Sequence, residues 1–449
     1  MRAFFAGFVV LSLVACGSNK GGGDDDDGGG DDDGQIPCEG LECQVVDCAK
    51  DGKPPTTLTG TVYAPNGKLP LYGVNVYIPR DPIPLPAFPE GAQCSRCSDE
   101  LPGRPLARVQ TDDAGRFRLE GVPAGDNIPL VIQTGKWRRQ ITIPRVDSCG
   151  EAALPDVDTR LPRTKAEGDI PKIALTTGNA DALECLIKKL GIDDSEVTID
   201  SKDGRVNFFV GNGVSKLANN DTLPNATTLW STEAKLKQYD IVFFSCEGNQ
   251  RAGTSKPQAS MNAVKAYADL GGRVFASHWH NVWIEGDTQG TGTGQKPDVW
   301  PGIATWSNAG NTTDPTIDVI DETSNPKGSA FSAWMLNVMG STNRGEIPLL
   351  NGTGRTTVNQ VDQTKGERWT YVKNNQNNGP TQNFQFTTPN EKPLVDRCGK
   401  VVFSDMHVSG NPMVGQPYPA ACPGTDLSAQ EKALAFMFFD IASCVGPIF

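Results

Sequence analysis

The chain has 449 residues, of which 37% are hydrophobic and 21% are charged, and its formal net charge is −12. This composition is typical of a globular protein of about two to three domains, and it excludes a chain that is disordered throughout or collagen-like. The negative charge argues against nucleic-acid binding, because the phosphate backbone is bound by a basic surface. The 12 Cys residues favour an oxidising compartment, and only three His residues are available for imidazole chemistry.

The N-terminus predicts an exported, lipid-anchored protein. An apolar run over 3–14 follows a single positive charge and is too short to span a bilayer stably. It leads into the sequence LVACG at 13–17, which resembles the lipobox of bacterial lipoproteins. That resemblance implies removal of a signal peptide over 1–15 and acylation of Cys16; an ordinary secretory signal with a chance Cys is the alternative. Asp at position 17 would favour retention in the inner membrane, but this chain has Gly17. The outer membrane of the cell envelope is therefore the expected location.

Residues 16–34 are expected to be the lipidated Cys and a flexible tether of Gly and Asp. Such a segment cannot bury a core, and its like charges repel one another. Calcium binding is the alternative, but a flexible Asp run lacks the fixed geometry of Ca²⁺ sites. We therefore expect a tether that holds the folded part away from the membrane, followed by a Cys-rich lead-in over 35–56.

Residues 57–146 show short runs in which apolar and polar residues alternate, separated by turn residues. This pattern predicts an antiparallel β-sandwich. The segments GTVYAPNGK, GVNVY and TDDAGRFRLEGVPAG resemble the carboxypeptidase regulatory-like domain, which implies a non-catalytic seven-strand sandwich and raises sugar binding as an option. An insertion over 80–105 carries Cys94 and Cys97. A CxxC pair can bind zinc or act in redox chemistry, but structural disulfides are the expectation here.

After a linker over 147–168, an α/β domain is expected over 169–449. Short, continuous apolar runs alternate with segments of helical periodicity, which predicts a three-layer domain with a parallel sheet. The expected strands cover 170–175, 239–245, 273–277 and 400–404, and the expected helices cover 181–190, 258–270 and 427–444.

Three segments of this domain, LKQYDIVFF, AVKAYADLGGRVFASH and GKVVFSDMH, resemble the class I glutamine-amidotransferase-like superfamily and, within it, the trehalose-utilisation (ThuA-like) group. The inserts at 201–235 and 281–395 match nothing in that pattern. The amidotransferases carry a nucleophilic Cys on the turn after the strand that corresponds to 273–277. This chain has His278 after Ser277 on that turn, so the glutaminase mechanism has no nucleophile and is not expected.

Polar residues follow the ends of three expected neighbouring strands, where open α/β sheets bind their ligands. His and carboxylate donors suit Zn²⁺ or another divalent ion, and a nearby carboxylate could activate a bound water. The alternative is that these His residues only form hydrogen bonds to buried loops. The candidate ligand or metal-binding residues are Cys246, Glu247, His278, His280, Asp405 and His407.

Two functions remain open from the sequence. A non-catalytic surface protein that binds a glycan or small molecule is the first, with Trp279 and Trp283 as candidate stacking residues or, alternatively, as the core of an insert. A metal-dependent hydrolase or sugar-modifying enzyme that uses the three His residues is the second.

The Cys count indicates one unpaired thiol. Lipidation of Cys16 leaves eleven Cys residues, which is an odd number. We expect Cys246, at the end of a buried strand, to be the unpaired one. Some of Cys398, Cys422 and Cys444 are expected to link the last strand and helix to the rest of the chain.

Overall fold

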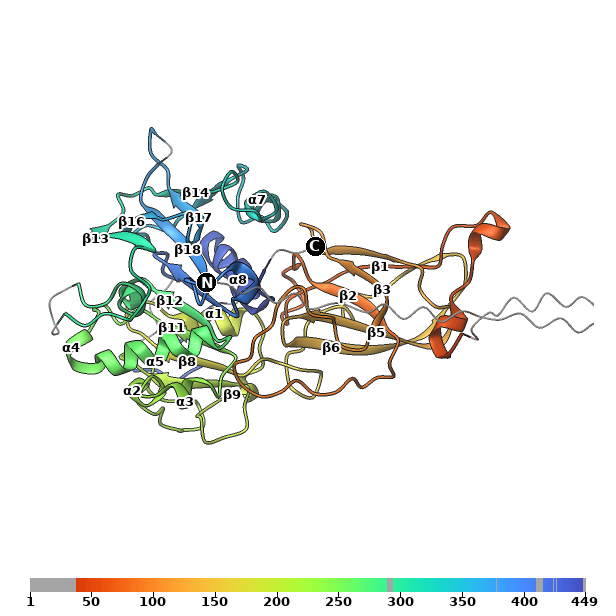
Figure 1. Ribbon diagram of the computed structural model, residues 1–449, viewed down its shortest axis with the longest axis horizontal. Helices are drawn as coiled ribbons and strands as arrows, with labels where there is room; N and C mark the ends of the chain where they lie inside the picture. The colour runs from red at the N-terminus through yellow and green to blue at the C-terminus, as the bar shows by residue number, and fades with distance from the viewer. Residues whose placement is uncertain are drawn as a thin grey trace, which may run out of the picture. The chain divides into compact units, whose positions relative to one another are not determined.

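The computed structural model describes residues 38–288, 294–376, 378–408, 415–422, 424 and 426–446 (Figure 1). The expected leader, tether and lipidated Cys16 lie outside these residues, so they stay predictions. Residues Gly40–Phe449 form one compact unit. Within the described part of the chain, no helix combines the length and apolar character that a membrane span requires.

Seven strands near the N-terminus form two small sheets, with strand orders β4-β1-β7 and β3-β2-β5-β6. Every pairing is antiparallel except that of β1 with β7. Inward residues of both sheets, such as Leu58 and Ile132, belong to one buried cluster, as the alternating pattern predicts. The strands are β1 (Thr57–Thr61), β2 (Asn75–Pro79), β3 (Pro105–Gln110), β4 (Arg116–Glu120), β5 (Gly125–Thr134), β6 (Trp137–Val146) and β7 (Glu151–Ala153).

The segment over 147–168, which we expected to be a linker, takes part in this fold. Its residues Glu151–Ala153 form β7 on the edge of β1. Cys149 is bonded to Cys48 of the lead-in, and Leu161 is fully buried. The segment is therefore held by a strand pairing, a disulfide and the core.

A single large sheet of 12 strands dominates the remainder of the chain. Six adjacent strands, in the order β19-β12-β11-β8-β10-β9, run parallel. Four of them (β8, β11, β12 and β19) correspond to the expected strands, whereas β9 and β10 were not predicted. They are β8 (Ile173–Thr177), β9 (Val197–Thr198), β10 (Val206–Val210), β11 (Ile241–Phe244), β12 (Arg273–Ser277) and β19 (Gly399–Ser404).

The other half of the large sheet differs from the parallel sheet that was expected. The insert over 281–395 supplies six strands that extend the sheet beyond β19 in antiparallel pairings. Short connections between consecutive strands favour antiparallel neighbours, whereas parallel strands require a long crossover. These strands are β13 (Ala304–Asn311), β14 (Ile317–Ile320), β15 (Glu346–Pro348), β16 (Arg355–Val361), β17 (Glu367–Val372) and β18 (Thr381–Thr388).

Helices cover both faces of the parallel half of the sheet (Figure 1). This part of the chain is therefore an α/β structure, as expected. Residues of α5 (Gln258–Asp269) pack with Val242 and Val274 on one face. Residues of α8 (Ala429–Ala442) and α1 (Leu183–Lys189) pack with Phe243 and Phe275 on the other. The short helices are α2 (Ala226–Leu229), α3 (Glu233–Leu236), α4 (Ala252–Ser255), α6 (Val282–Glu285), α7 (Gly328–Asn337), η1 (Gly40–Gln44), η2 (Cys48–Asp51), η3 (Asp194–Glu196), η4 (His278–Asn281) and η5 (Leu394–Asp396).

Two disulfides join the insertion of the small sheets to the large-sheet part. Cys94 is bonded to Cys398, just before β19, and Cys97 to Cys444, just after α8. The CxxC pair therefore forms structural disulfides, as predicted, but with two distant partners. Cys185–Cys422 is a further disulfide, and Cys38 and Cys43 are also disulfide-bonded. The expected contribution of Cys398, Cys422 and Cys444 to linking the end of the chain is confirmed.

Candidate functional site

The ends of three adjacent parallel strands bring the candidate residues together. Strand β12 lies between β11 and β19, so the segments that follow these strands meet at one edge of the sheet. Cys246, His278 and His407 offer ligand atoms that lie within 4.8 Å of one another, and they are the only such group in the described part of the chain. Beside them lies a cavity of about 240 Å³, the rim cavity, lined by Ala180, Gly248, His278, Trp279, Gly310, Asn311, Arg355 and His407.

His278 occupies the turn directly after β12 with a positive φ of 43°. A non-glycine residue rarely adopts this left-handed conformation, and such strain is concentrated at functional sites. The side chain is 5% exposed. Its Nδ1 lies 3.3 Å from Sγ of Cys246, and its ring centre lies 5.0 Å from that of His407. The turn after β12 therefore places a buried imidazole beside Cys246 and His407.

Cys246 is the free cysteine of the described chain, as we expected, and it is completely buried. The backbone N–H of Gly248 donates a hydrogen bond to its sulfur over 3.4 Å. Burial raises the pKa of the thiol to about 12, so the sulfur keeps its proton at neutral pH. Gly248 and His278 line the rim cavity, whereas Cys246 does not.

Arg355 contacts His407 at the wall of the rim cavity. The guanidinium Nη2 lies 3.1 Å from Nδ1 of His407. Because a guanidinium only donates hydrogen bonds, Nδ1 accepts, and the proton of the neutral imidazole is on Nε2. Burial, and then the charge of Arg355, lowers the pKa of His407 to about 3. Burial also lowers the pKa of His278 well below its usual value. Both rings are therefore neutral at pH 7.

The Nε2 atoms of His278 and His407 are the unusual feature of this site. Both are buried, and neither has a hydrogen-bond partner within the described part of the chain. A buried polar group without a partner costs about 1–3 kcal/mol. Unpartnered polar atoms beside a cavity are therefore a reason to look for a bound group there.

His280 does not join the other two His residues, which differs from the expected convergence of all three. The indole Nε1 of Trp283 donates to Nδ1 of His280 over 2.9 Å, and Nε2 of His280 lies 2.9 Å from the carbonyl oxygen of Ser245. Both ring nitrogens thus have protein partners. Burial lowers the pKa of His280 well below its usual value, which is consistent with a neutral ring in the core.

The two candidate carboxylates are also paired elsewhere. Glu247 accepts a hydrogen bond from Lys256 over 2.6 Å, and both side chains are buried. Asp405 accepts from the backbone N–H and the hydroxyl of Thr357, each over 2.7 Å. Burial raises the pKa of Asp405 to about 7. Neither residue lines the rim cavity, so the structure does not place Glu247 as a base there.

The two candidate tryptophans have different environments. Trp279 is half-buried, lines the rim cavity and contacts His278 with ring centres 4.6 Å apart. Trp283 is fully buried and packs against Trp230 and Phe244. The core interpretation therefore holds for Trp283, and Trp279 is the one that can touch a ligand.

Arg355 is the site residue that sequence reasoning missed. It begins β16, inside the insert that matched no pattern, and reaches the site only because the antiparallel half extends the sheet. No local motif marks this residue, since its role depends on a contact with His407, 52 positions away.

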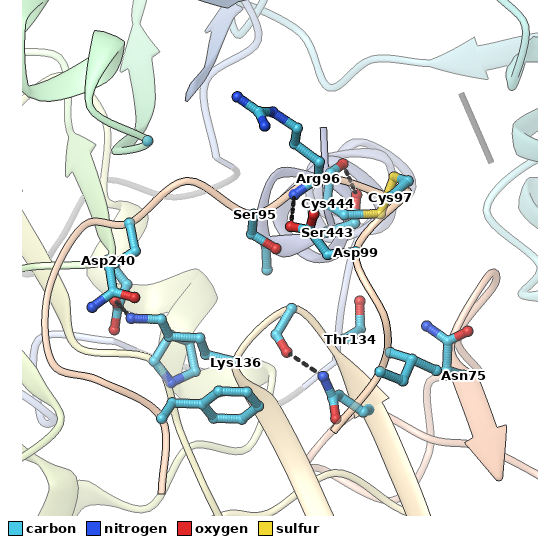
Figure 2. Close-up of a pocket in the computed structure, with 18 of the residues that line it drawn as sticks. Asn75, Ser95, Arg96, Cys97, Asp99, Thr134, Lys136, Asp240, Ser443 and Cys444 are labelled. Atoms are coloured by element: carbon cyan, nitrogen blue, oxygen red, sulfur yellow. Dashed lines mark hydrogen bonds and ion pairs between the residues drawn. A yellow bond between two sulfur atoms is a disulfide. The ribbon is translucent and has the colours of Figure 1, made fainter. Parts of the chain in front are cut away.

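A second cavity, of about 550 Å³, lies under the disulfide-bonded insertion and is here called the strap cavity. Figure 2 shows Lys136 and Asp240 on one side and the Cys97–Cys444 disulfide on another. The Lys136 ammonium donates to Asp240 and to the carbonyl oxygens of Pro89 and Gly91. Lys136 and Asp240 therefore have partners, whereas Nε of Arg96, which also lines the strap cavity, is buried without one in the described part of the chain.

Comparisons with known proteins give only distant similarities. No family model and no curated protein matches the chain. Among solved structures, a ThuA-like protein from Bacteroides uniformis is 11% identical, with coverage of 60% of this chain and 90% of its own, at a TM-score of 0.28. A cold-adapted β-galactosidase from Rahnella sp. R3 is 10% identical, with coverage of 60% and 30%, at a TM-score of 0.27.

A type II cohesin–X-dockerin complex from Acetivibrio cellulolyticus matches with 16% identity over 33% of this chain and 78% of its own, at a TM-score of 0.16. A ThuA-like protein is thus among the structural neighbours. At these identities and TM-scores, none of the similarities assigns a function to this chain.

Proposed function

We propose that this chain is a lipid-anchored, extracytoplasmic binding protein without catalytic activity, and that it holds a small-molecule ligand in the rim cavity. In this proposal the two small sheets are a regulatory-like sandwich, and the large-sheet part is a ThuA-like binding domain. One observation carries the proposal: two buried imidazole Nε2 atoms, of His278 and His407, lack a partner beside this cavity. A ligand atom that accepts a hydrogen bond would satisfy them.

The state of the thiol argues against nucleophilic catalysis. A Cys nucleophile acts as the thiolate, which forms when an adjacent cation or base lowers the thiol pKa. Burial raises the pKa of Cys246 to about 12 instead. The neighbouring imidazole of His278 is a weak base, because burial lowers its pKa well below the usual value. Neither group is matched to proton transfer near pH 7.

Thermal unfolding of the purified full chain, with a panel of sugars, hydroxy acids and amino acids, tests the binding function. We expect at least one compound to raise the unfolding midpoint without being chemically changed. The Trp279→Ala variant should lose that shift. Lys50→Ala is the matched control, because this side chain is 80% exposed on the lead-in, and it should keep the shift. Turnover of a compound, or no shift with any compound, would contradict the proposal.

The anchor is tested separately by metabolic labelling with a fatty acid. The wild-type chain should incorporate the label and sediment with the outer membrane. Cys16→Ala should do neither, because it removes the thiol that is acylated. Labelling that persists in this variant would place the lipid on another residue.

A metal-dependent enzyme is the second candidate function, and the grouping of Cys246, His278 and His407 favours it. Thiolate and imidazole ligands suit Zn²⁺, which would supply a nucleophilic water. In a tetrahedral zinc site the ligand atoms lie less than about 4 Å apart, so the three residues would have to draw together. Arg355 opposes metal binding by His407, because its charge and its bond to Nδ1 hold the imidazole proton on Nε2. Metal analysis of the purified chain distinguishes the two functions.

A further inference from the structure

We propose, on the basis of the binding function above, that the rim cavity recognises the carboxylate group of a small organic acid. Three side chains at the wall, those of Arg355, His407 and His278, present hydrogen-bond donors. The argument rests on the positions of their protons, on the charge of the wall and on the size of the cavity.

His407 is a donor toward the cavity because of Arg355. The guanidinium donates to Nδ1, so the ring proton is on Nε2. That Nε2–H has no acceptor within the described part of the chain. A lone pair is therefore not available on Nε2 for a cation, whereas the N–H is available for an oxygen.

His278 has the same tautomer for a different reason. The sulfur of Cys246 accepts the backbone N–H of Gly248 over 3.4 Å. We assign the S–H as the donor to Nδ1 of His278, 3.3 Å away, because the sulfur already accepts from Gly248. With this assignment, the proton of the neutral ring is also on Nε2. Two N–H groups without acceptors result.

Arg355 gives the wall of the rim cavity a positive charge, and no acidic side chain lines this cavity. Arg355 is the only residue with a permanent charge among those that line it. Asp405 and Asp181 lie near Arg355, whose charge partly offsets the effect of burial on their pKa values. Their oxygens accept hydrogen bonds from Thr357 and from Ser277, and neither side chain lines the cavity. A single guanidinium with neutral imidazoles matches one negative charge, which is the charge of a carboxylate.

Arg355 also retains donors for the ligand. Two N–H groups of Nη1 are occupied by the carbonyl oxygens of Gly352 and Gly354, and one of Nη2 by His407. A guanidinium has five N–H groups, so two are left without a partner in the described part of the chain. The planar guanidinium matches the planar carboxylate.

The volume restricts the size of the acid. About 240 Å³ is below the usual range of drug-sized sites, about 300–1,000 Å³. It corresponds to about eight groups the size of a water molecule. The half-buried ring of Trp279 and the amide of Asn311 complete the wall, so a short acid with a hydroxyl or an apolar group fits best.

Isothermal titration calorimetry with the full chain tests the assignment. The probes are glycolate, its neutral counterpart glycolamide, inorganic phosphate and Zn²⁺. We expect glycolate to bind at least tenfold more tightly than glycolamide. Arg355→Gln should weaken glycolate binding at least tenfold. The affinity of Arg355→Lys, which keeps the charge but not the planar group, should lie between those of the wild type and Arg355→Gln. Because the acid–amide comparison uses the wild-type chain, it remains decisive if Arg355→Gln does not fold.

Each other outcome overturns the proposal in a distinct way. Binding of phosphate but not glycolate would show that the cavity recognises a different oxyanion and not a carboxylate. Stoichiometric binding of Zn²⁺ without glycolate binding would favour the metal-dependent function. Binding of a neutral sugar that is lost in Trp279→Ala, with no response to glycolate, would overturn the carboxylate while leaving the proposed binding function in place.

Discussion

The guanidinium of Arg355 donates from Nη2 to Nδ1 of His407 over 3.1 Å. This contact joins the start of β16, in the antiparallel half of the large sheet, to the segment that follows β19 in the parallel half. It fixes which nitrogen of His407 carries the proton and, after burial, is the second cause of the low pKa of this ring. The candidate site is therefore a product of both halves of the sheet.

The tautomer of His407 is directly measurable. In the wild-type chain, ¹⁵N NMR should show the proton of His407 on Nε2 at pH 7. Replacing Arg355 with Met removes a positive charge, so the pKa of His407 should rise from about 3. It should stay below the usual value, because burial is the larger cause of the shift. A pH titration of the ring resonances measures both; an unchanged pKa in the variant would show that Arg355 has no influence.

The two tryptophans should respond differently to truncation. Trp283→Ala should lower the free energy of unfolding by about 3–5 kcal/mol, as for other large core residues, because the ring is fully buried against Trp230 and Phe244. Trp279→Ala should cost clearly less, because its side chain is half-buried at the cavity. Urea unfolding of both variants measures the difference. Equal losses would mean that Trp279 is a core residue as well.

Glu184 on α1 should make stability fall as the pH rises. The side chain is 0% exposed, and neither carboxylate oxygen has a partner in the described part of the chain. Burial raises its pKa from 4.5 to about 8. The unfolded chain thus loses this proton near pH 4.5 and the folded chain only near pH 8. The free energy of unfolding should therefore decrease between these values, by an amount on the order of a few kcal/mol.

The Glu184→Gln variant lacks this titration. The free energy of unfolding of the variant, relative to that of the wild type, should increase from pH 4.5 to pH 8 in denaturant unfolding. This trend does not depend on how much the buried amide destabilises the variant at any one pH. Asp181, whose pKa burial raises to about 6, titrates in both chains and so contributes to both stability curves. A difference that is constant with pH would mean that Glu184 is ionised in the folded chain.

The two disulfides of the insertion should contribute non-additively. Cys94–Cys398 and Cys97–Cys444 close overlapping long loops, with sequence separations of 304 and 347. With one of them present, the other closes a smaller loop of about 50 residues, and loop entropy grows with loop length. Replacing either pair with Ser should lower the free energy of unfolding by about 2–4 kcal/mol. Replacing both pairs should lower it by more than the sum of the two single losses. Denaturant unfolding of the three variants measures this; simple additivity would contradict the loop argument.

The sequence determined four of the six parallel strands to within a few residues, and which residues follow them, but not β9 and β10. Apolar runs at 239–245, 273–277 and 400–404 became three adjacent strands, so Cys246, His278 and His407 had to meet at one edge. The odd Cys count similarly indicated the unpaired Cys246. These features depend on local periodicity and on sheet topology, which are properties of the sequence pattern.

The tertiary structure alone decided which side chains face the cavity. It directed His280 to the carbonyl of Ser245, buried Trp283 in the core, and paired Glu247 with Lys256. It also brought in Arg355 from an insert without a recognisable pattern, through antiparallel pairings that no local signal marks. Side-chain direction and long-range pairing result from packing between distant segments, and spacing along the chain does not encode them.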